Sequence, residues 1–171
     1  CSADAILEKA ATTPSLGAVL VEPVLGREGV VFPPRGWLAD LAEACRRTRL
    51  LLIVDEIFTG FGRTGTLFAV DAEGVRPALI FLGKALGGGL PLAAVVGRQQ
   101  VLAAWGGRGE ALHTATFVGN PLACAAALAV LKIVSQERLV RRASAAGAIV
   151  ESALGVLPHI VRGRGLLWGI E

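Results

Sequence analysis

Two apolar runs that each lead to an ionisable side chain constrain the fold of this chain more than any other feature. Residues 50–54 are followed by Asp55 and Glu56, and residues 78–82 are followed, after one glycine, by Lys84. Apolar runs of this length, bounded by glycine-rich segments, predict buried strands. In an open α/β sheet, ligands bind at the carboxyl ends of the strands. We therefore expect Asp55 and Lys84 to lie at the ligand-binding edge of such a sheet.

The free-energy cost of burying charge indicates that Asp55 and Lys84 each need a partner. An unpaired carboxylate or ammonium group beside a sheet core is expensive, so Asp55 and Lys84 either pair with each other or meet a common ligand. Pyridoxal phosphate is a ligand of the second kind, because its aldehyde forms a Schiff base with a lysine amine and its protonated ring nitrogen needs a carboxylate. From spacing alone, side chains that are merely solvated remain an alternative.

The residues before Asp55 predict a β-α-β unit. Residues 16–23 form an apolar run that ends near Glu22, and residues 36–48 place apolar side chains at helical spacing. Such a unit implies parallel strands and a right-handed crossover. With 171 residues, of which 53% are hydrophobic and 18% charged, the chain suits one α/β domain whose mostly parallel sheet is flanked by helices. The apolar face of the expected helix consists of Trp37, Leu38, Leu41 and Cys45.

The segment before residue 121 carries the signals of a helix start. Asn120 is a favourable cap, and Pro121 suits the first helical position. Thr116 lies just before this start, where a hydroxyl group suits an anion, although a plain loop threonine is the alternative. The other expected elements are helices over residues 2–12, 121–134 and 136–156 and a strand over residues 92–97.

Neither glycine-rich stretch matches a nucleotide-binding motif. Residues 60–65 contain a G-x-G-x-x-G pattern, but it follows a carboxylate pair and opens no predicted helix, so it is weak evidence. The stretch around Lys84 does not match a P-loop, because Ala85 stands where Ser or Thr is required and Ala78 replaces the leading glycine.

Composition argues against several other classes. The 17 basic residues are scattered and are balanced by 14 acidic ones, so no nucleic-acid surface is predicted. Cys1, Cys45 and Cys124 show no metal-ligand spacing, and His113 lies far from His159. We therefore predict no metal site, and reduced cysteines in a cytoplasmic protein. No apolar run reaches the about 18 residues of a membrane helix, so no membrane association is predicted.

Three segments of the chain resemble the class III pyridoxal-phosphate aminotransferases, the family of the ornithine, acetylornithine and 4-aminobutyrate transaminases. They are LLLIVDEIFTGFGRTG, residues 50–65; PALIFLGKALGGGLPLAAVVG, residues 77–97; and HTATFVGNPLACAAALAVL, residues 113–131. The resemblance extends over nearly the whole chain. It implies the large domain of a fold-type-I transferase and pyridoxal 5'-phosphate (PLP) as the cofactor.

The resemblance also implies roles for individual residues. Lys84 corresponds to the Schiff-base lysine, and Asp55 to the partner of the pyridine nitrogen. Thr116 corresponds to a threonine that binds the cofactor phosphate from the neighbouring subunit of a homodimer. Glu22 matches a glutamate that pairs with a substrate-site arginine in ornithine-type members. Phe58 stands where those members often carry a glutamine that contacts the phenolic oxygen of the cofactor.

Compared with the family, the chain is expected to be truncated at both ends. Residues 1–157 would be the second half of the cofactor domain, including its long linking helix, and residues 158–171 the first strand of the small C-terminal domain. The family's upstream phosphate cup and stacking aromatic, and its downstream substrate-binding arginine, have no counterpart in these residues.

The reaction implied is transamination, in which an amino group moves from an amino acid or ω-amine to a 2-oxo acid. Two alternatives stay open at this point. Related class III enzymes include an aminomutase and a decarboxylase, which share the lysine and the aspartate. A catalytically silent fragment or interaction scaffold is the third possibility, motivated by the shortness of the chain.

Overall fold

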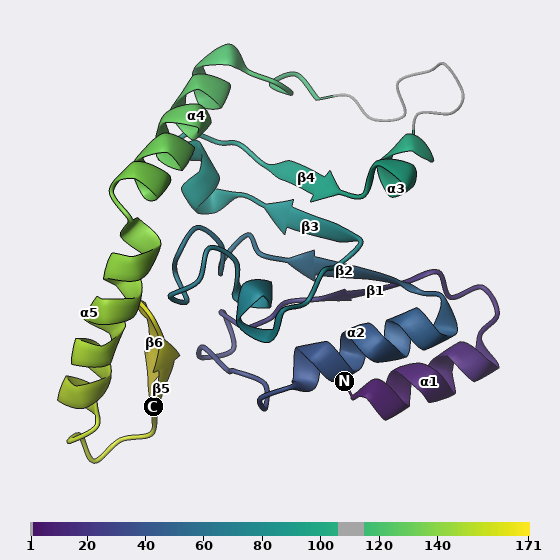
Figure 1. The fold of residues 1–171 in the computed structure, drawn as a ribbon, viewed down its shortest axis with the longest axis horizontal. Coiled ribbons are helices and arrows are strands. Elements are labelled where there is room, and N and C mark those ends of the chain that lie inside the picture. Colours follow the sequence, from purple (N-terminus) through teal and green to yellow (C-terminus); the bar gives the residue numbers. More distant parts are fainter. Residues whose placement is uncertain (1, 106–114) are drawn as a thin grey trace.

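A four-stranded sheet lies at the centre of the computed structural model, which describes residues 2–105 and 115–171 (Figure 1). Its strands follow one another in space in sequence order, and the first three run parallel. The last strand pairs antiparallel with the third. The prediction of a mostly parallel α/β sheet is therefore confirmed. The strands are β1 (Ala18–Val21), β2 (Leu51–Asp55), β3 (Leu79–Leu82) and β4 (Ala94–Gly97).

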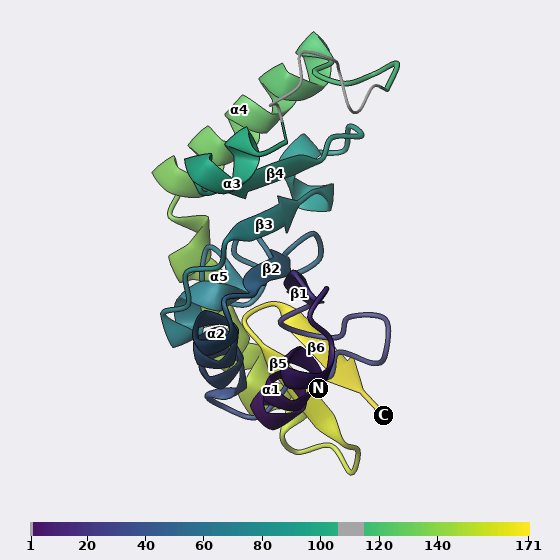
Figure 2. The same cartoon turned by 90° about the vertical axis from the view of Figure 1, so that its right-hand side faces the viewer.

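Helices cover one side of the sheet. Helix α1 (Ala3–Thr12) packs against α2 (Trp37–Thr48), and α2 connects β1 with β2 as predicted. In Figure 2, α2 lies to the left of the strands, and α4 crosses above β4. The main core fills the space between the sheet and these two N-terminal helices. Its buried side chains are Ile6, Val19, Leu38, Leu41, Ala44, Cys45, Leu50, Leu52, Val54, Val70 and Val75.

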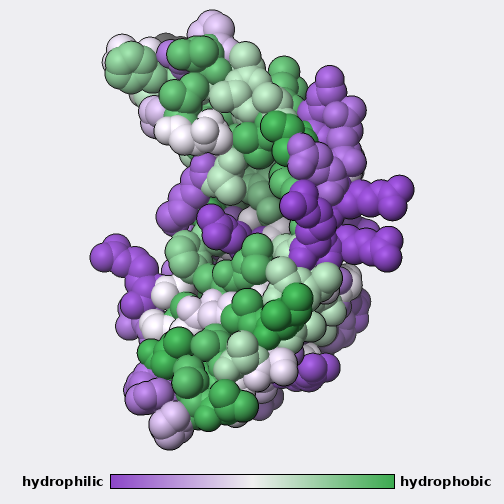
Figure 3. Space-filling model, turned by 90° about the vertical axis from the view of Figure 1, so that its left-hand side faces the viewer, coloured by the Kyte–Doolittle hydropathy of each residue, from purple (hydrophilic) through white to green (hydrophobic). Residues whose placement is uncertain are grey.

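The opposite side of the sheet carries apolar side chains that no described helix covers. Cross-strand register places Leu20 beside Ile53, and Phe81 beside Val95. Of these, Leu20 is 58% exposed and Val95 52% exposed. Figure 3, which views the molecule from the side toward which β1, β2 and β3 run, shows apolar surface over α4 at the top and again over the lower part.

The C-terminal third differs from its prediction in two places. The expected helix over residues 136–156 is α5 (Leu139–Leu154), because Arg138 adopts a left-handed backbone, φ +52°, that separates it from α4 (Pro121–Gln136). Residues 158–171 were expected to form one strand, but they form a hairpin of β5 (Val161–Arg164) and β6 (Leu167–Ile170). The cause is the two-residue loop between the strands, where Gly165 takes φ +59°.

Three glycines bring the hairpin, α5 and the loop after β2 into backbone contact. A Cβ atom added to Gly147 would lie 2.6 Å from the carbonyl oxygen of Gly165. One added to Gly165 would lie 2.5 Å from the amide nitrogen of Gly65. The contact is closed by a hydrogen bond of 2.9 Å from the Leu166 amide to the Arg63 carbonyl. No side chain fits between these three segments.

A carboxylate from a distant segment caps the start of α2. Gly36 occupies the cap position of this helix and has no side chain to serve there. Glu73, at the end of the short 3-10 helix η1 (Ala69–Glu73), accepts hydrogen bonds from the amides of Gly36 at 3.3 Å, Leu38 at 3.1 Å and Ala39 at 3.1 Å. A negative charge at a helix N-terminus also opposes the helix dipole favourably.

We expect Glu73→Ala to lower the free energy of unfolding by about 1–2 kcal/mol, the usual cost of losing an N-terminal cap. Urea unfolding followed by circular dichroism measures the change. Glu43→Ala is the matched control, because the Glu43 carboxylate is exposed and its hydrogen bonds within the described residues go to Arg46 of its own helix. An equal loss of stability in both variants would contradict the capping role of Glu73.

Candidate functional site

Asp55 and Glu22 lie at the carboxyl ends of neighbouring parallel strands. Asp55 is the last residue of β2, is half-buried, and accepts a hydrogen bond of 2.9 Å from the amide of Ile57. Glu22 follows β1 directly and is exposed. Both residues line one hollow of about 760 Å³, whose walls include Leu20 and Trp37. Two of the five predicted site residues therefore share a single cavity.

Lys84 lies at the end of the next strand and has an unusual backbone. It begins the 3-10 helix η2 (Lys84–Gly87) two residues after β3, with φ +43°. A left-handed conformation costs a residue other than glycine about 1–2 kcal/mol, and such residues concentrate at functional sites. The turn is held by α4, since a Cβ atom at Gly88 would lie 2.9 Å from Cγ2 of Val130.

The Lys84 side chain contacts an aromatic ring and not a carboxylate. Its side chain is exposed rather than buried beside the core, because the left-handed backbone turns the chain out of the sheet at this point. Asp55 and Lys84, which are both described, form no ion pair with each other. Instead the Lys84 Nζ atom lies 5.1 Å from the centroid of the Phe58 ring. The direct ion pair considered from sequence is absent, so a shared ligand and plain solvation of the two side chains remain as the alternatives.

Phe58 is held in place from behind by Gly26. A Cβ atom added to Gly26 would lie 2.5 Å from Cδ1 and 2.6 Å from Cε1 of the ring. The ring also packs against a small buried cluster formed by Val24, Val30 and Leu167. Phe58 is therefore a fixed aromatic surface between the loop after β1 and Lys84.

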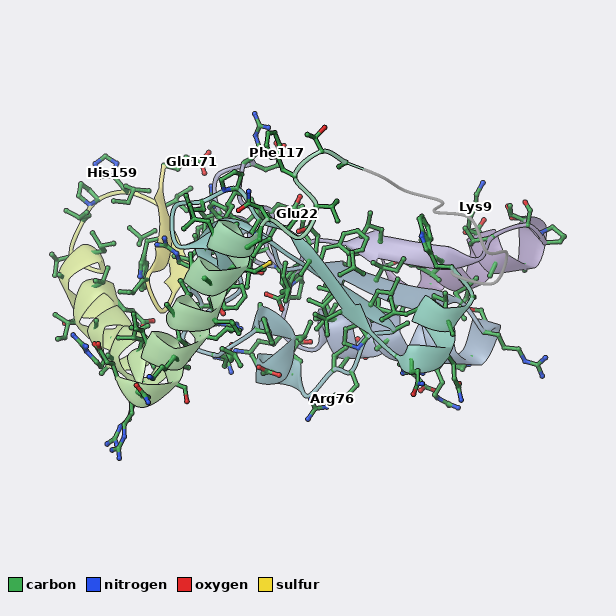
Figure 4. All side chains as sticks on the ribbon, turned by 90° about the horizontal axis from the view of Figure 1, so that it is seen from above. Lys9, Glu22, Arg76, Phe117, His159 and Glu171 are labelled. Atoms are coloured by element: carbon green, nitrogen blue, oxygen red, sulfur yellow. The ribbon has the colours of Figure 1, made fainter. Side chains whose placement is uncertain are left out.

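Thr116 stands apart from the other four predicted residues. It is exposed, lies in a turn over residues 116–119, and makes no hydrogen bond or ion pair with Glu22, Asp55, Phe58 or Lys84. In Figure 4, its neighbour Phe117 and Glu22 point to the side of the sheet opposite Arg76.

The helix start that follows Thr116 has the cap predicted from the sequence. Asn120 Oδ1 accepts hydrogen bonds from the amides of Leu122 at 3.0 Å and Ala123 at 3.2 Å. Pro121 takes the first helical position. The predicted helix start is therefore confirmed.

Glu56 was not among the predicted site residues, yet it is the most deeply buried charged side chain of the region. It is fully buried, accepts a hydrogen bond of 2.9 Å from the amide of Val70, and also accepts one from the hydroxyl of Thr59. Burial raises the pKa of this carboxyl, an effect that the Thr59 hydroxyl and the amides of Ala69 and Val70 partly oppose. Strand alternation is the signal that places Asp55 and Glu56 on opposite sides.

The raised pKa makes stability depend on pH in a defined direction. The folded chain favours protonated Glu56. The contribution of this protonation to the free energy of unfolding is therefore fully present below the ordinary pKa of a carboxyl group, and it is lost as the pH rises through the raised pKa of the folded state. We expect the stability of the native chain relative to Glu56→Gln to fall as the pH rises above about 4, the ordinary pKa of a glutamate carboxyl. Urea unfolding at several pH values measures it, with Glu151→Gln on the surface of α5 as control. A constant difference would contradict the prediction.

The described residues show no other recognisable centre. They contain no group of three His, Cys, Asp or Glu side chains that could hold a metal ion. Within the same residues, Cys45 and Cys124 are free thiols and no helix is long and apolar enough to cross a membrane. Cys1 and His113, considered as ligands from sequence, lie outside the described part of the chain.

Curated relatives of the chain are ornithine and acetylornithine aminotransferases. The chain is 42% identical over 171 residues to the ornithine aminotransferase of Bacillus cereus strain Q1, covering 95% of this chain and 42% of that protein. It is 45% identical over 157 residues to the acetylornithine aminotransferase of Methanopyrus kandleri, covering 90% and 40%. The chain thus spans less than half the length of the curated relatives it matches.

Solved structures give the same picture for the fold. The ornithine aminotransferase of Toxoplasma gondii, which carries PLP at partial occupancy in its active site, superimposes with a TM-score of 0.91 at 41% identity. The match covers 99% of this chain and 41% of that one. It confirms the α/β fold expected from the resemblance.

The family model for class III aminotransferases matches residues 3–171. The match includes both strand ends that carry Asp55 and Lys84, as well as the turn that carries Thr116. With agreement over nearly the whole chain in sequence and in fold, the chain belongs to the class III aminotransferase family.

Proposed function

We propose that this chain carries the lysine and aspartate of a PLP-dependent transaminase, which moves an amino group from an amino donor to a 2-oxo acid. The observation that supports this most is the presentation of an amine and a carboxylate from the ends of adjacent parallel strands without an ion pair between them. Lys84 and Asp55 are thereby both left available for a common ligand. Class III aminotransferases use PLP as their cofactor.

The residues present fit this cofactor. Lys84 offers a primary amine that is exposed and held by no carboxylate, and Asp55 offers an oxygen to a pyridinium nitrogen while the Ile57 amide orients its carboxylate. Phe58 gives an apolar flank beside the amine. Thr116 offers a hydroxyl donor for phosphate just before a capped helix start. When bound, PLP supplies an electron sink that lets a C–H bond next to nitrogen ionise.

In this proposal, some side chains hold the cofactor or the substrate, and Lys84 also transfers a proton. Asp55 would stabilise a positive charge on the ring nitrogen of the cofactor. Lys84 would hold the cofactor through Nζ, and as a free amine it could take up or give back a proton at the substrate carbon. Glu22 lines the same hollow as Asp55, so we assign it to the substrate side, where its carboxylate can hold a basic group.

Completion of the site requires a second subunit in this proposal. Thr116 is exposed and contacts none of the other site residues, while Phe117 is 76% and Val118 69% exposed beside it. An exposed apolar turn next to a phosphate-binding hydroxyl supports a homodimer with the active site at its interface. We also propose that residues 158–171 belong to the small C-terminal domain. A cytoplasmic location stays a prediction from the cysteine content.

The experiment that tests the proposed function is reductive trapping of PLP. The purified protein is mixed with PLP, its absorbance spectrum is recorded before and after borohydride, and its peptides are mapped. A visible band that borohydride removes, with the reduced cofactor fixed on Lys84, is the expected result. Cofactor spread evenly over Lys9, Lys84 and Lys132 would count against the proposal. Incubation of loaded protein with an amino donor and a 2-oxo acid then identifies the product.

A further inference from the structure

The amine of Lys84 has an aromatic partner. Its Nζ atom lies 5.1 Å from the centroid of the Phe58 ring, within the range at which a ring face attracts a cation. Among the described residues, no carboxylate forms an ion pair with Lys84. The Phe58 ring is therefore the contact that the structure gives this amine.

The Phe58 ring can hold the amine in one place because the ring itself is immobilised by its neighbours. Gly26 leaves no room behind it, since any Cβ atom there would come within 2.5 Å of the ring. The ring packs against Val24, Val30 and Leu167, which are all buried. The loop that carries Gly26 begins just after Glu22, and is closed by a pair of hydrogen bonds between Leu25 and Val31. A rigid aromatic face is thus built from segments far apart in the sequence.

We propose that Phe58 is the positioning residue for Lys84, and that its ring holds the ammonium group whenever the lysine is not joined to the cofactor. The proposal rests on the proposed function, in which Lys84 is released during each turnover and must return. The neutral Phe58 side chain suits this task better than a carboxylate would. It attracts the ammonium group of Lys84, but it does not compete with Asp55 for the positively charged pyridine nitrogen of the cofactor. The proposal also predicts that the π face of the side chain at position 58, and not only its volume, holds the Lys84 amine in place.

The test uses the protein without cofactor and measures how fast each lysine is acetylated by acetic anhydride. The chain has three lysines, so Lys9 and Lys132, both exposed, serve as internal standards for Lys84. In Phe58→Leu the ring no longer holds the amine, and acetylation of Lys84 relative to the standards should rise about two- to fivefold, as expected for an exposed cation–π contact. Phe58→Tyr keeps a π face and should stay within the native range.

A third substitution at position 58 separates the electrostatic role of the ring from its packing. Pentafluorophenylalanine at position 58 nearly keeps the shape of the ring, but its face does not attract a cation. Lys84 in that protein should react as in Phe58→Leu, while thermal unfolding stays close to that of the native chain. Equal acetylation of Lys84 in all four proteins would overturn the role of Phe58. That result is independent of whether PLP attaches to Lys84, so it is distinct from failure of the proposed function.

Discussion

Replacing Lys84 with alanine is expected to abolish the fixation of PLP on the chain and to stop turnover. The variant removes the amine that anchors the cofactor and the group that carries the proton. A positioned acid–base group alone contributes on the order of 10²–10⁴ in rate, so the loss in kcat should exceed this range when both roles are removed. Mass spectrometry of borohydride-treated peptides and assays of the holoenzyme with amino donor measure the two effects.

The matched control is Lys132→Ala, which removes another exposed lysine, on α4. This variant should keep both PLP fixation and turnover. If Lys84→Ala retained native turnover while Lys132→Ala lost it, the assignment of the reacting amine would be wrong. Stability is expected to move little in Lys84→Ala, because the side chain is exposed.

Gly165→Ala is expected to have the largest effect on stability. The new Cβ atom would lie 2.5 Å from the Gly65 amide nitrogen, 2.6 Å from the Thr64 carbonyl carbon and 2.8 Å from the Arg63 carbonyl oxygen, all of which are backbone atoms. Overpacking costs about 1–3 kcal/mol, and a left-handed backbone adds about 1–2 kcal/mol. We expect a loss of about 3 kcal/mol or more, measured by urea unfolding, with faster amide exchange in β5 and β6.

Substitutions at three other glycines separate the cost of the steric clash from the cost of the left-handed backbone. Gly74→Ala has the same left-handed backbone, φ +65°, but open space around the new atom, so it should report the backbone cost alone. Gly147→Ala reports the clash alone, because this glycine lies inside a helix and faces the carbonyl of Gly165. Gly17→Ala has neither problem and should be neutral. If Gly147→Ala stabilised the chain, as helix propensity by itself predicts, the glycine contact would not be tight.

The strands, the N-terminal helices and the strand-end positions of Asp55 and Lys84 were all predictable, because each depends on local sequence. Apolar runs located β2 and β3, helical spacing located α2, and the Asn120–Pro121 pair located the start of α4. The β-α-β rule then gave the parallel direction of β1 and β2. These signals operate within about a dozen residues.

The contacts that shape the site could not be predicted, because they join distant segments. Nothing in the local sequence indicates that Gly26 makes room for Phe58, or that the Lys84 amine would lie over that ring. The exposure of Lys84 could not be decided from the sequence either, because the apolar strand before it suggests burial while a solvated side chain stayed an open alternative. The hairpin was missed because Gly165 acts through its backbone angle and through a contact with Gly65.

The cap on α2 has a consequence for the order in which the chain can fold. Leu38 receives its hydrogen-bond acceptor from Glu73, 35 residues further along the chain. During synthesis, the helix therefore emerges before the group that completes its first turn, and it stays frayed until β2 has formed and η1 has folded back. Helix α2, strand β2 and η1 should then gain protection in one cooperative step. A nascent chain that stops between residues 55 and 68 would hold this helix in a partly open state.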